Sequence, residues 1–208
     1  MSNSAPSSAA FGNKRRNGLR NRLGIGLGVG LGLVAVLFTG CGTRHAGPGA
    51  DKAGAMAMMS GPMAMASLTP TEGNQVRGLV MFHAMADHLM VHAKLSGLKP
   101  NAEHGFHVHE TGSCASADGS SAGGHFNPDG RVHGPQNAPH HAGDMPSLKA
   151  DAKGSVDQKF MLTGVTMAAG STSLVGRSVI VHALADDYQT QPTGNSGARI
   201  GCGVIAAH

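Results

Sequence analysis

The chain has 208 residues, which is enough for one domain with appendages, and it is rich in glycine but poor in aromatic side chains. Its formal net charge is +4, yet five of the 16 Lys and Arg residues lie within residues 1–40, which hold no acidic residue. The other 11 are outnumbered by the 12 Asp and Glu residues. The body of the chain therefore offers no electrostatic reason to bind nucleic acid.

Residues 1–40 have the parts of a secretory signal peptide. A basic stretch at 14–22 precedes the apolar run LGIGLGVGLGLVAVLF at 23–38. This run is shorter than the roughly 20 residues that span a bilayer comfortably, although a tilted membrane anchor stays open. The run ends in LFTGC, which resembles a bacterial lipoprotein cleavage box and implies that Cys41 carries a lipid. We therefore expect an exported protein of the cell envelope, in the periplasm, with a lipid anchor in a membrane.

Residues 41–67 predict a flexible tether, because Gly, Ala, Pro, Ser and Met follow one another without apolar periodicity. Thioethers are soft ligands that suit Cu(I), but a linker biased toward alanine and methionine is the preferred interpretation of this segment. Its five methionines are Met56, Met58, Met59, Met63 and Met65. The chain has three cysteines, an odd number for an exported protein. If Cys41 is lipidated, Cys114 and Cys202 are left as one disulfide.

Residues 68–208 predict an all-β domain. Residues 75–82 and 89–98 form a candidate β-hairpin, because short apolar runs flank a polar turn. Its inward positions are expected to be Val80, Phe82, Leu89, Val91 and Ala93. Further strand-like runs occupy 106–109, 158–167, 178–184 and 198–206. Several short strands, long loops and no convincing amphipathic helix indicate an antiparallel sandwich or barrel.

Histidines gather around a long loop at residues 110–147. In the preceding stretch GFHVHE, His107 and His109 would point to the same side of a strand, about 7 Å apart. Together with side chains from the loop and from the strand near 182, they make seven potential metal ligands: His107, His109, His125, His133, His141, Asp144 and His182. These are enough for two sites, of which an all-imidazole set suits copper and a mixed set suits zinc. A zinc ion would also explain how so long a loop is held.

The motifs GFHVHE, GGHFNP, HHAGD, VHALADD and GNSGARIGCGVI occur in this order over residues 72–206. With them the chain resembles the Cu,Zn superoxide dismutase family, and specifically its bacterial exported form. The resemblance implies an eight-stranded antiparallel Greek-key barrel or sandwich with long metal-binding loops. It also implies that the protein converts superoxide to dioxygen and hydrogen peroxide with copper and zinc as cofactors.

The resemblance implies a role for each potential ligand. Copper would be held by His107, His109, His125 and His182. Zinc would be held by His125, His133, His141 and Asp144, so that the imidazolate of His125 bridges the two ions and can carry a proton in catalysis. His140 stands next to His141 and makes the third zinc ligand ambiguous, but His141 keeps the family's spacing to Asp144.

The resemblance also assigns residues around the metals. Asp186 would link a copper histidine to a zinc histidine, and Arg199 would attract and orient the superoxide anion near copper. Cys114 and Cys202 match the family's disulfide. The segment 187–199 holds no lysine or glutamate and so lacks the charged loop of eukaryotic members. Four further histidines match no ligand of the family and are expected at the surface: His83, His88, His92 and His104.

Two other functions fit part of the pattern. A zinc lyase or hydrolase could use the H-x-H pair with a distant histidine, but it leaves His133, Asp144 and His182 without a role. A non-enzymatic copper-binding or delivery module could share the fold. Such a module would not need Arg199, however, and this chain has it. The expected partners are superoxide and a membrane lipid, and the sequence leaves monomer and homodimer open.

Overall fold

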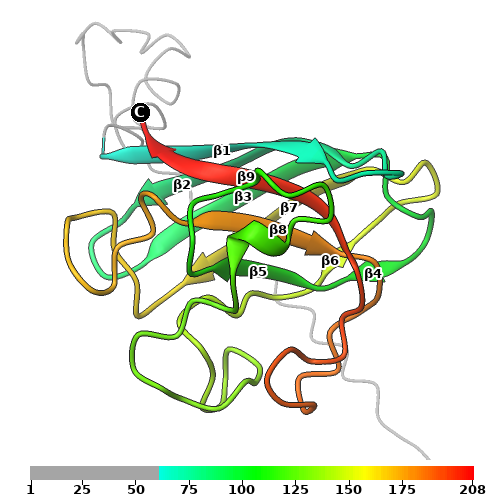
Figure 1. Ribbon diagram of the computed structural model, residues 1–208. Coiled ribbons are helices and arrows are strands. Elements are labelled where there is room, and N and C mark those ends of the chain that lie inside the picture. Colours follow the sequence, from blue (N-terminus) through cyan, green and yellow to red (C-terminus); the bar gives the residue numbers. More distant parts are fainter. Residues whose placement is uncertain (1–60) are drawn as a thin grey trace, which may run out of the picture. The chain divides into compact units, whose positions relative to one another are not determined.

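The computed structural model describes residues 61–208, which form nine β-strands and a single short 3-10 helix (Figure 1). The strands are β1 (Met63–Pro70), β2 (Arg77–Ala84), β3 (Leu89–Ser96), β4 (Glu103–His104), β5 (Phe106–His109), β6 (Leu148–Lys149), β7 (Val156–Leu162), β8 (Ser178–His182) and β9 (Arg199–Ala207); the helix, η1, is Ser120–Ala122. No helix among these residues is long and apolar enough to cross a membrane. The expected signal peptide, Cys41 and most of the tether lie outside the described residues.

Seven strands form one antiparallel sheet in the order β5-β8-β9-β1-β2-β3-β7, and β4 pairs with β6 in a separate ladder. The sheet curls, so that β5, β8 and β9 face β2, β3 and β7 across the core (Figure 1). The chain crosses from β3 to β5 and returns from β7 to β8, which are the long connections of a Greek key. The expected all-β antiparallel fold is confirmed, with seven strands in the main sheet and two very short ones beside it.

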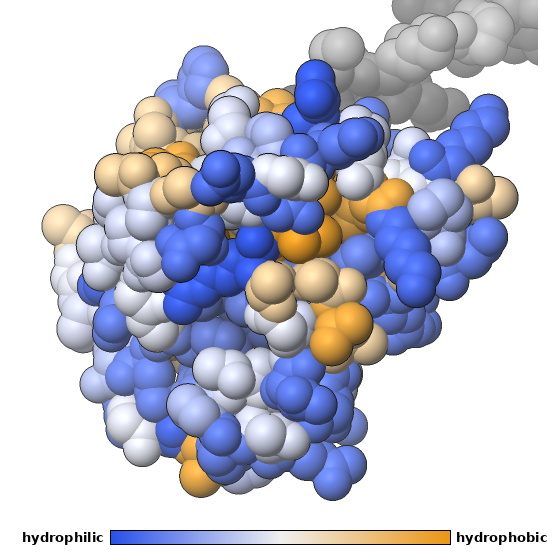
Figure 2. Space-filling view, turned by 45° about the vertical axis from the view of Figure 1, so that its right-hand side comes forward, coloured by the Kyte–Doolittle hydropathy of each residue, from blue (hydrophilic) through white to orange (hydrophobic). Residues whose placement is uncertain are grey.

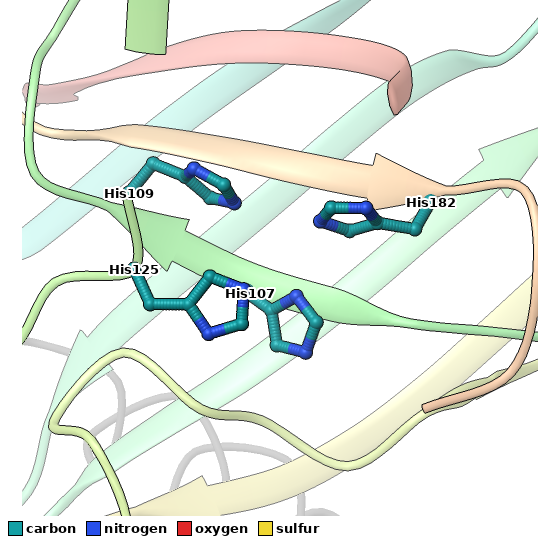
Figure 3. A group of neighbouring side chains, drawn as sticks. All are labelled: His107, His109, His125 and His182. Carbon is teal, nitrogen blue, oxygen red and sulfur yellow. The ribbon is translucent and has the colours of Figure 1, made fainter. Parts of the chain in front are cut away.

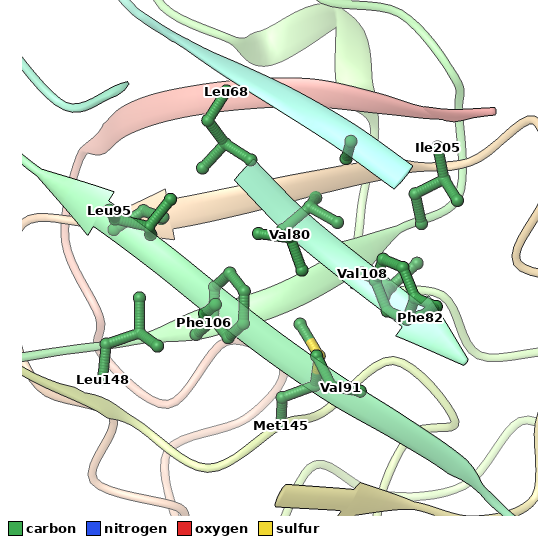
Figure 4. Close-up of a cluster of buried hydrophobic side chains, with 14 of the residues drawn as sticks. Leu68, Val80, Phe82, Val91, Leu95, Phe106, Val108, Met145, Leu148 and Ile205 are labelled. Atoms are coloured by element: carbon green, nitrogen blue, oxygen red, sulfur yellow. The ribbon is translucent and has the colours of Figure 1, made fainter. Parts of the chain in front are cut away.

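The core forms between the two halves of the curled sheet (Figure 4). Apolar and outward positions alternate along β2 and β3, and the register pairs Val80 with Ala93 and Phe82 with Val91. All five positions predicted to point inward in this hairpin are buried. From the opposite half, Phe106 of β5 packs edge-on against Phe160 of β7, with ring centroids 6.3 Å apart. Burial of each such side chain contributes roughly 1.5–3 kcal/mol to folding.

Strand β1 corrects the expected boundary of the tether. Residues 63–67 were predicted to belong to the tether, but they form the first part of β1, hydrogen-bonded between β9 and β2. Ala64, Ala66 and Leu68 alternate toward the core and are at most 2% exposed. Alanine has too little apolar surface to make this alternation visible in the sequence. Pairing with strands on both sides decides the conformation instead.

The described surface is mainly polar. On the face drawn in Figure 2, hydrophilic residues predominate and hydrophobic residues form small patches among them. Only five large hydrophobic residues within 61–208 are strongly exposed: Met85, Val132, Met161, Leu184 and Val204. Single exposed apolar residues are normal on protein surfaces.

Candidate metal centre

Two groups of side chains within residues 61–208 present potential metal-ligating atoms, and all their members are buried. The first group is His107, His109, His125 and His182; the second is His125, His133, His141 and Asp144. Within each group the ligating atoms all lie within 4.8 Å of one another. The four histidines of the first group point their rings toward a common centre (Figure 3). All seven residues singled out in the sequence are thus brought together, and His125 is common to both groups.

Strand β5 supplies two histidines because its side chains alternate. Phe106 and Val108 face the core, whereas His107 and His109 face the other side, toward the long loop. His182 stands at the end of β8, which pairs with β5.

The loop returns to the free edge of β5 twice. His125 forms an isolated β-bridge with His109, and Asp144 forms one with His107. The amide of Phe126 donates to the carbonyl of Val108 at 2.8 Å, and the Val108 amide donates to Gly143 at 2.8 Å. These backbone bonds place loop ligands beside strand ligands.

Each histidine of the first group keeps one ring nitrogen free for an ion. Within the described residues, four of these buried nitrogens have no hydrogen-bond partner: His107 Nδ1, His109 Nε2, His125 Nε2 and His182 Nε2. Buried polar atoms without a partner are rare in folded proteins, because no hydrogen bond compensates for the free energy lost when water is removed from them. Four of them in one cluster therefore fit a bound cation with nitrogen ligands.

The opposite ring nitrogens are all engaged, which orients the rings. His107 Nε2 lies 2.7 Å from Asp186 Oδ2. His109 Nδ1 lies 2.9 Å from the carbonyl oxygen of Gly123, and His182 Nδ1 lies 3.1 Å from that of Gly197. An acceptor at one nitrogen keeps the proton there, so the other nitrogen presents its lone pair.

The second group is built around the carboxylate of Asp144. His125 Nδ1 lies 2.8 Å and His141 Nδ1 3.3 Å from Oδ1, while His133 Nδ1 lies 3.0 Å from Oδ2 without hydrogen-bond geometry. Three imidazole nitrogens and one carboxylate oxygen are a donor set that four-coordinate zinc uses. His140 is outside the group, because its Nδ1 donates to the carbonyl of Ala138.

Asp186 joins the two groups. Its Oδ2 accepts from His107 Nε2 at 2.7 Å, and its Oδ1 accepts from His133 Nε2 at 2.9 Å. The backbone amide of Tyr188 also donates to Oδ1 at 2.7 Å. A single buried carboxylate thereby contacts one histidine of each group.

Burial and neighbouring charges set the ionisation of these groups. Burial lowers the pKa of His125 to about 4 and that of His182 to about 3, so both rings are neutral near pH 7. Burial also lowers the pKa values of His107 and His109. For Asp144 burial opposes the charged form, but the adjacent imidazoles of His125, His133 and His141 outweigh it and hold the carboxyl pKa well below its usual range.

The pKa of His133 is shifted in the opposite direction from those of the four histidines of the first group. Burial disfavours its charged form, but Asp144 and Asp186 on its two sides outweigh burial and raise its pKa to about 9. The ring therefore prefers a positive charge between the two carboxylates. A cation bound between His133 and Asp144 would replace the ring proton at that position.

Arg199, the first residue of β9, lies beside the first group. Its Nη1 donates to the carbonyl of Gly119 and its Nη2 to that of Gly123, both at 2.7 Å. The Gly123 carbonyl also accepts from His109 Nδ1, so guanidinium and imidazole share one acceptor. Arg199 lines an open surface hollow of about 570 Å³ that also contains the carboxylates of Glu72 and Asp118.

A disulfide ties the loop to β9. Cys114 and Cys202 are bonded, with Cα atoms 5.8 Å apart and a sequence separation of 88. Cys202 lies in the same strand as Arg199, and Cys114 precedes the Gly119 and Gly123 carbonyls that hold the guanidinium. The disulfide expected from the resemblance is therefore present, and it fixes the loop next to Arg199.

His104 was expected at the surface, and this is wrong. It is only 1% exposed, and its Nδ1 lies 2.8 Å from the backbone carbonyl oxygen of His182. The contact holds the end of β8, from which the His182 ring projects. Residues 104 and 182 are 78 positions apart, so no local pattern around His104 could reveal it. His83, His88 and His92 are partly exposed.

Comparisons with known proteins agree with this geometry. The sequence profile of the family described as copper/zinc superoxide dismutase matches residues 76–205. The chain is 41% identical over 143 residues to superoxide dismutase-like protein YojM of Bacillus subtilis (strain 168), covering 66% of this chain and 73% of the relative. It is 40% identical over 147 residues to superoxide dismutase [Cu-Zn] 2 of Aquifex aeolicus (strain VF5), and this match covers 68% of this chain and 85% of the relative.

The fold is also similar to that of a solved structure. The crystal structure of a SOD-like protein from Bacillus subtilis superposes on this fold with a TM-score of 0.62 and 40% sequence identity. The match covers 67% of this chain and 95% of that chain.

Proposed function

The chain belongs to the copper/zinc superoxide dismutase family, and from this premise we propose that its two side-chain groups divide the reaction between a catalytic copper and a structural zinc. Copper and zinc are its cofactors, and dismutation of superoxide is its activity. What is proposed here is which residues hold each metal and what each residue does.

Copper is held by His107, His109, His125 and His182. The observation that carries this assignment is the cluster of four buried ring nitrogens without hydrogen-bond partners. Copper bound there would supply the one-electron redox chemistry that dismutation needs. Four neutral imidazoles suit this metal, and the lowered pKa values keep the rings unprotonated near neutral pH.

Zinc is held by His125, His133, His141 and Asp144 and has a structural role. Residues 110–147 contain little regular structure beyond η1, so ligand bonds would replace the missing backbone ladder. The carboxylate at the centre of three imidazoles supports a divalent cation at this position.

His125 is the proton carrier. Its Nδ1 faces Asp144 in the zinc group, whereas its Nε2 belongs to the copper group and is otherwise free. Because the Nδ1 side holds the ring in place, Nε2 can accept a proton from solvent and donate it to the reduced oxygen species without the ring moving away. With zinc in place of the proton on Nδ1, the ring would stay neutral when Nε2 takes up a proton, so the low pKa of the metal-free ring does not oppose this role.

Arg199 and Asp186 support the reaction without binding a metal. The Arg199 guanidinium stays protonated and attracts the anion, while the Gly119 and Gly123 carbonyls hold it in place. Asp186 is a positioning residue that fixes the tautomers of His107 and His133 through its two oxygens.

We also propose export and lipid attachment at Cys41, supported by the basic stretch, the apolar run and the TGC sequence. Relatives include an extracellular superoxide dismutase [Cu-Zn] of Drosophila melanogaster.

Metal content measured together with activity tests the division of labour. The purified full chain should contain one copper and one zinc per chain, and chelation should abolish turnover. Copper should restore turnover in chelated protein, whereas zinc alone should not. His182→Ala should lose turnover while retaining zinc, because His182 belongs only to the first group. Turnover by copper-free protein, or by His182→Ala at the native rate, would refute the assignment.

A further inference from the structure

One outer face of the sheet is lined by methionine and histidine side chains. Along β1, β2, β3 and β7, core residues alternate with residues that point away from the core. Seven of the outward positions form what we call the Met/His face: Met63, Met65, Met81, His83, Met90, His92 and Met161. None of them is fully buried, and Met161 is 60% exposed.

The strand register brings these residues into two rows. In the first row Met63 pairs with His83, His83 with Met90, and Met90 with Met161. Directly opposed residues of an antiparallel pair share one face, with Cβ atoms about 5 Å apart. The sulfur of methionine lies two bonds beyond Cβ on a flexible chain, so thioethers on both sides of His83 can converge on its ring.

The second row lies beside the first but is already engaged. There Met65 pairs with Met81, Met81 with His92, and His92 with Lys159. The His92 ring lies 2.6 Å from Asp157 Oδ1. By contrast, no hydrogen bond to the His83 ring is present within residues 61–208. The first row therefore offers the available donor nitrogen.

Thioethers and imidazole together select a soft, monovalent metal. Methionine sulfur is a neutral, polarisable ligand that favours Cu(I) over harder cations such as Mg²⁺ or Ca²⁺, and imidazole also suits copper. We propose that Met63, His83 and Met90 bind one Cu(I) ion on the outer face of the sheet.

This site is separate from the metal centre described above. Its ligands come from β1, β2 and β3, whereas the other strand ligands come from β5 and β8 in the opposite half of the curled sheet. The core residues Ala64, Phe82 and Val91 lie beneath the face and belong to the sheet's other side. The inference goes beyond dismutation and does not depend on which residues hold the catalytic copper.

The test uses the full chain with its copper and zinc already loaded. Under anaerobic conditions, Cu(I) is titrated in competition with a coloured Cu(I) chelator, and X-ray absorption identifies the ligands of the added ion. The native chain should bind one further Cu(I) with sulfur ligands, and Zn²⁺ should not compete for it. The double variant Met63→Leu/Met90→Leu should weaken this binding at least tenfold with dismutase activity unchanged, because leucine conserves volume but removes the thioether.

Met167→Leu is the matched control, because Met167 packs against the core cluster and lies outside the strands of the face. It should bind the added Cu(I) like the native chain. The proposal is overturned if the loaded protein takes up no further Cu(I), or if the added ion has only nitrogen and oxygen ligands. It is equally overturned if the double variant binds as tightly as the native chain, since other thioethers, such as those of Met56, Met58 and Met59, would then hold the ion.

Discussion

Replacing Arg199 tests how the anion reaches the copper group. The guanidinium is held by two carbonyls and shares an acceptor with His109, and Arg199 lines the surface hollow. Arg199→Glu reverses the charge at this point. Arg199→Lys keeps the charge but replaces a planar guanidinium by one ammonium, which does not reproduce the paired hydrogen bonds to the Gly119 and Gly123 carbonyls. The two variants therefore separate the contribution of charge from that of geometry.

The expected loss of rate on substitution of Arg199 follows from how far this side chain is exposed to water. Two unit charges 4 Å apart interact by about 1 kcal/mol in water and about 4 kcal/mol at an effective permittivity of 20. Arg199 is half-buried at an open hollow, so loss of its charge should cost ~1–2 kcal/mol, or roughly 5- to 30-fold in rate. Charge reversal should about double this free energy and reduce kcat/KM by roughly 30-fold or more. Arg199→Lys should lose only about two- to fivefold, because attraction remains.

The assay is superoxide decay followed directly at increasing ionic strength, on protein with equal copper and zinc content. The native rate should fall with salt because screening shortens the reach of the field. In Arg199→Glu this fall should be weaker or reversed. Lys153→Glu, at an exposed turn, is a control with the same change in net charge and should leave the rate within about twofold. A native rate and native salt dependence in Arg199→Glu would show that the residue does not guide the anion.

Three further predictions address the loop, the zinc group and the leader. His141→Gln should reduce zinc content and lower Tm, whereas the neighbouring His140→Gln should do neither; equal loss of zinc in both variants would remove the distinction between them. Replacing Cys114 and Cys202 by serine should destabilise the domain by up to about 4–5 kcal/mol, since the disulfide spans 88 residues, and denaturant unfolding of both forms measures this. Cys41→Ser should abolish labelling by a radioactive fatty acid and release the protein from membranes; unchanged labelling would place the lipid elsewhere.

Much of the metal centre could be predicted from the sequence because its signals are local. The spacing of His107 and His109 places both rings on one side of a strand, whatever the rest of the chain does. The alternation in β2 and β3 likewise identified five buried inward residues of that hairpin, and of the buried apolar residues it missed only Leu95 near the end of β3. The cluster of histidines in one long loop indicated metal binding, because so long a loop needs something to hold it.

Other features depended on contacts between distant residues. Strand β1 was assigned partly to the tether because Ala64 and Ala66 carry too little apolar surface to reveal their alternation, and only pairing with β9 and β2 makes the segment a strand. His104 is buried by a contact with residue 182, and its local sequence resembles that of an exposed histidine.

The tertiary structure also decided which atoms of the site are available. Composition and spacing name the histidines, but the acceptor at one ring nitrogen decides which nitrogen is left for an ion, and those acceptors come from residues 123, 186 and 197. In the same way, methionines scattered between residues 63 and 161 become neighbours only through the register of four strands. The sequence determines the kinds of ligand and their local spacing. Convergence of those ligands on one point requires the backbone to be folded, because the strands that carry them are joined by hydrogen bonds between distant parts of the chain.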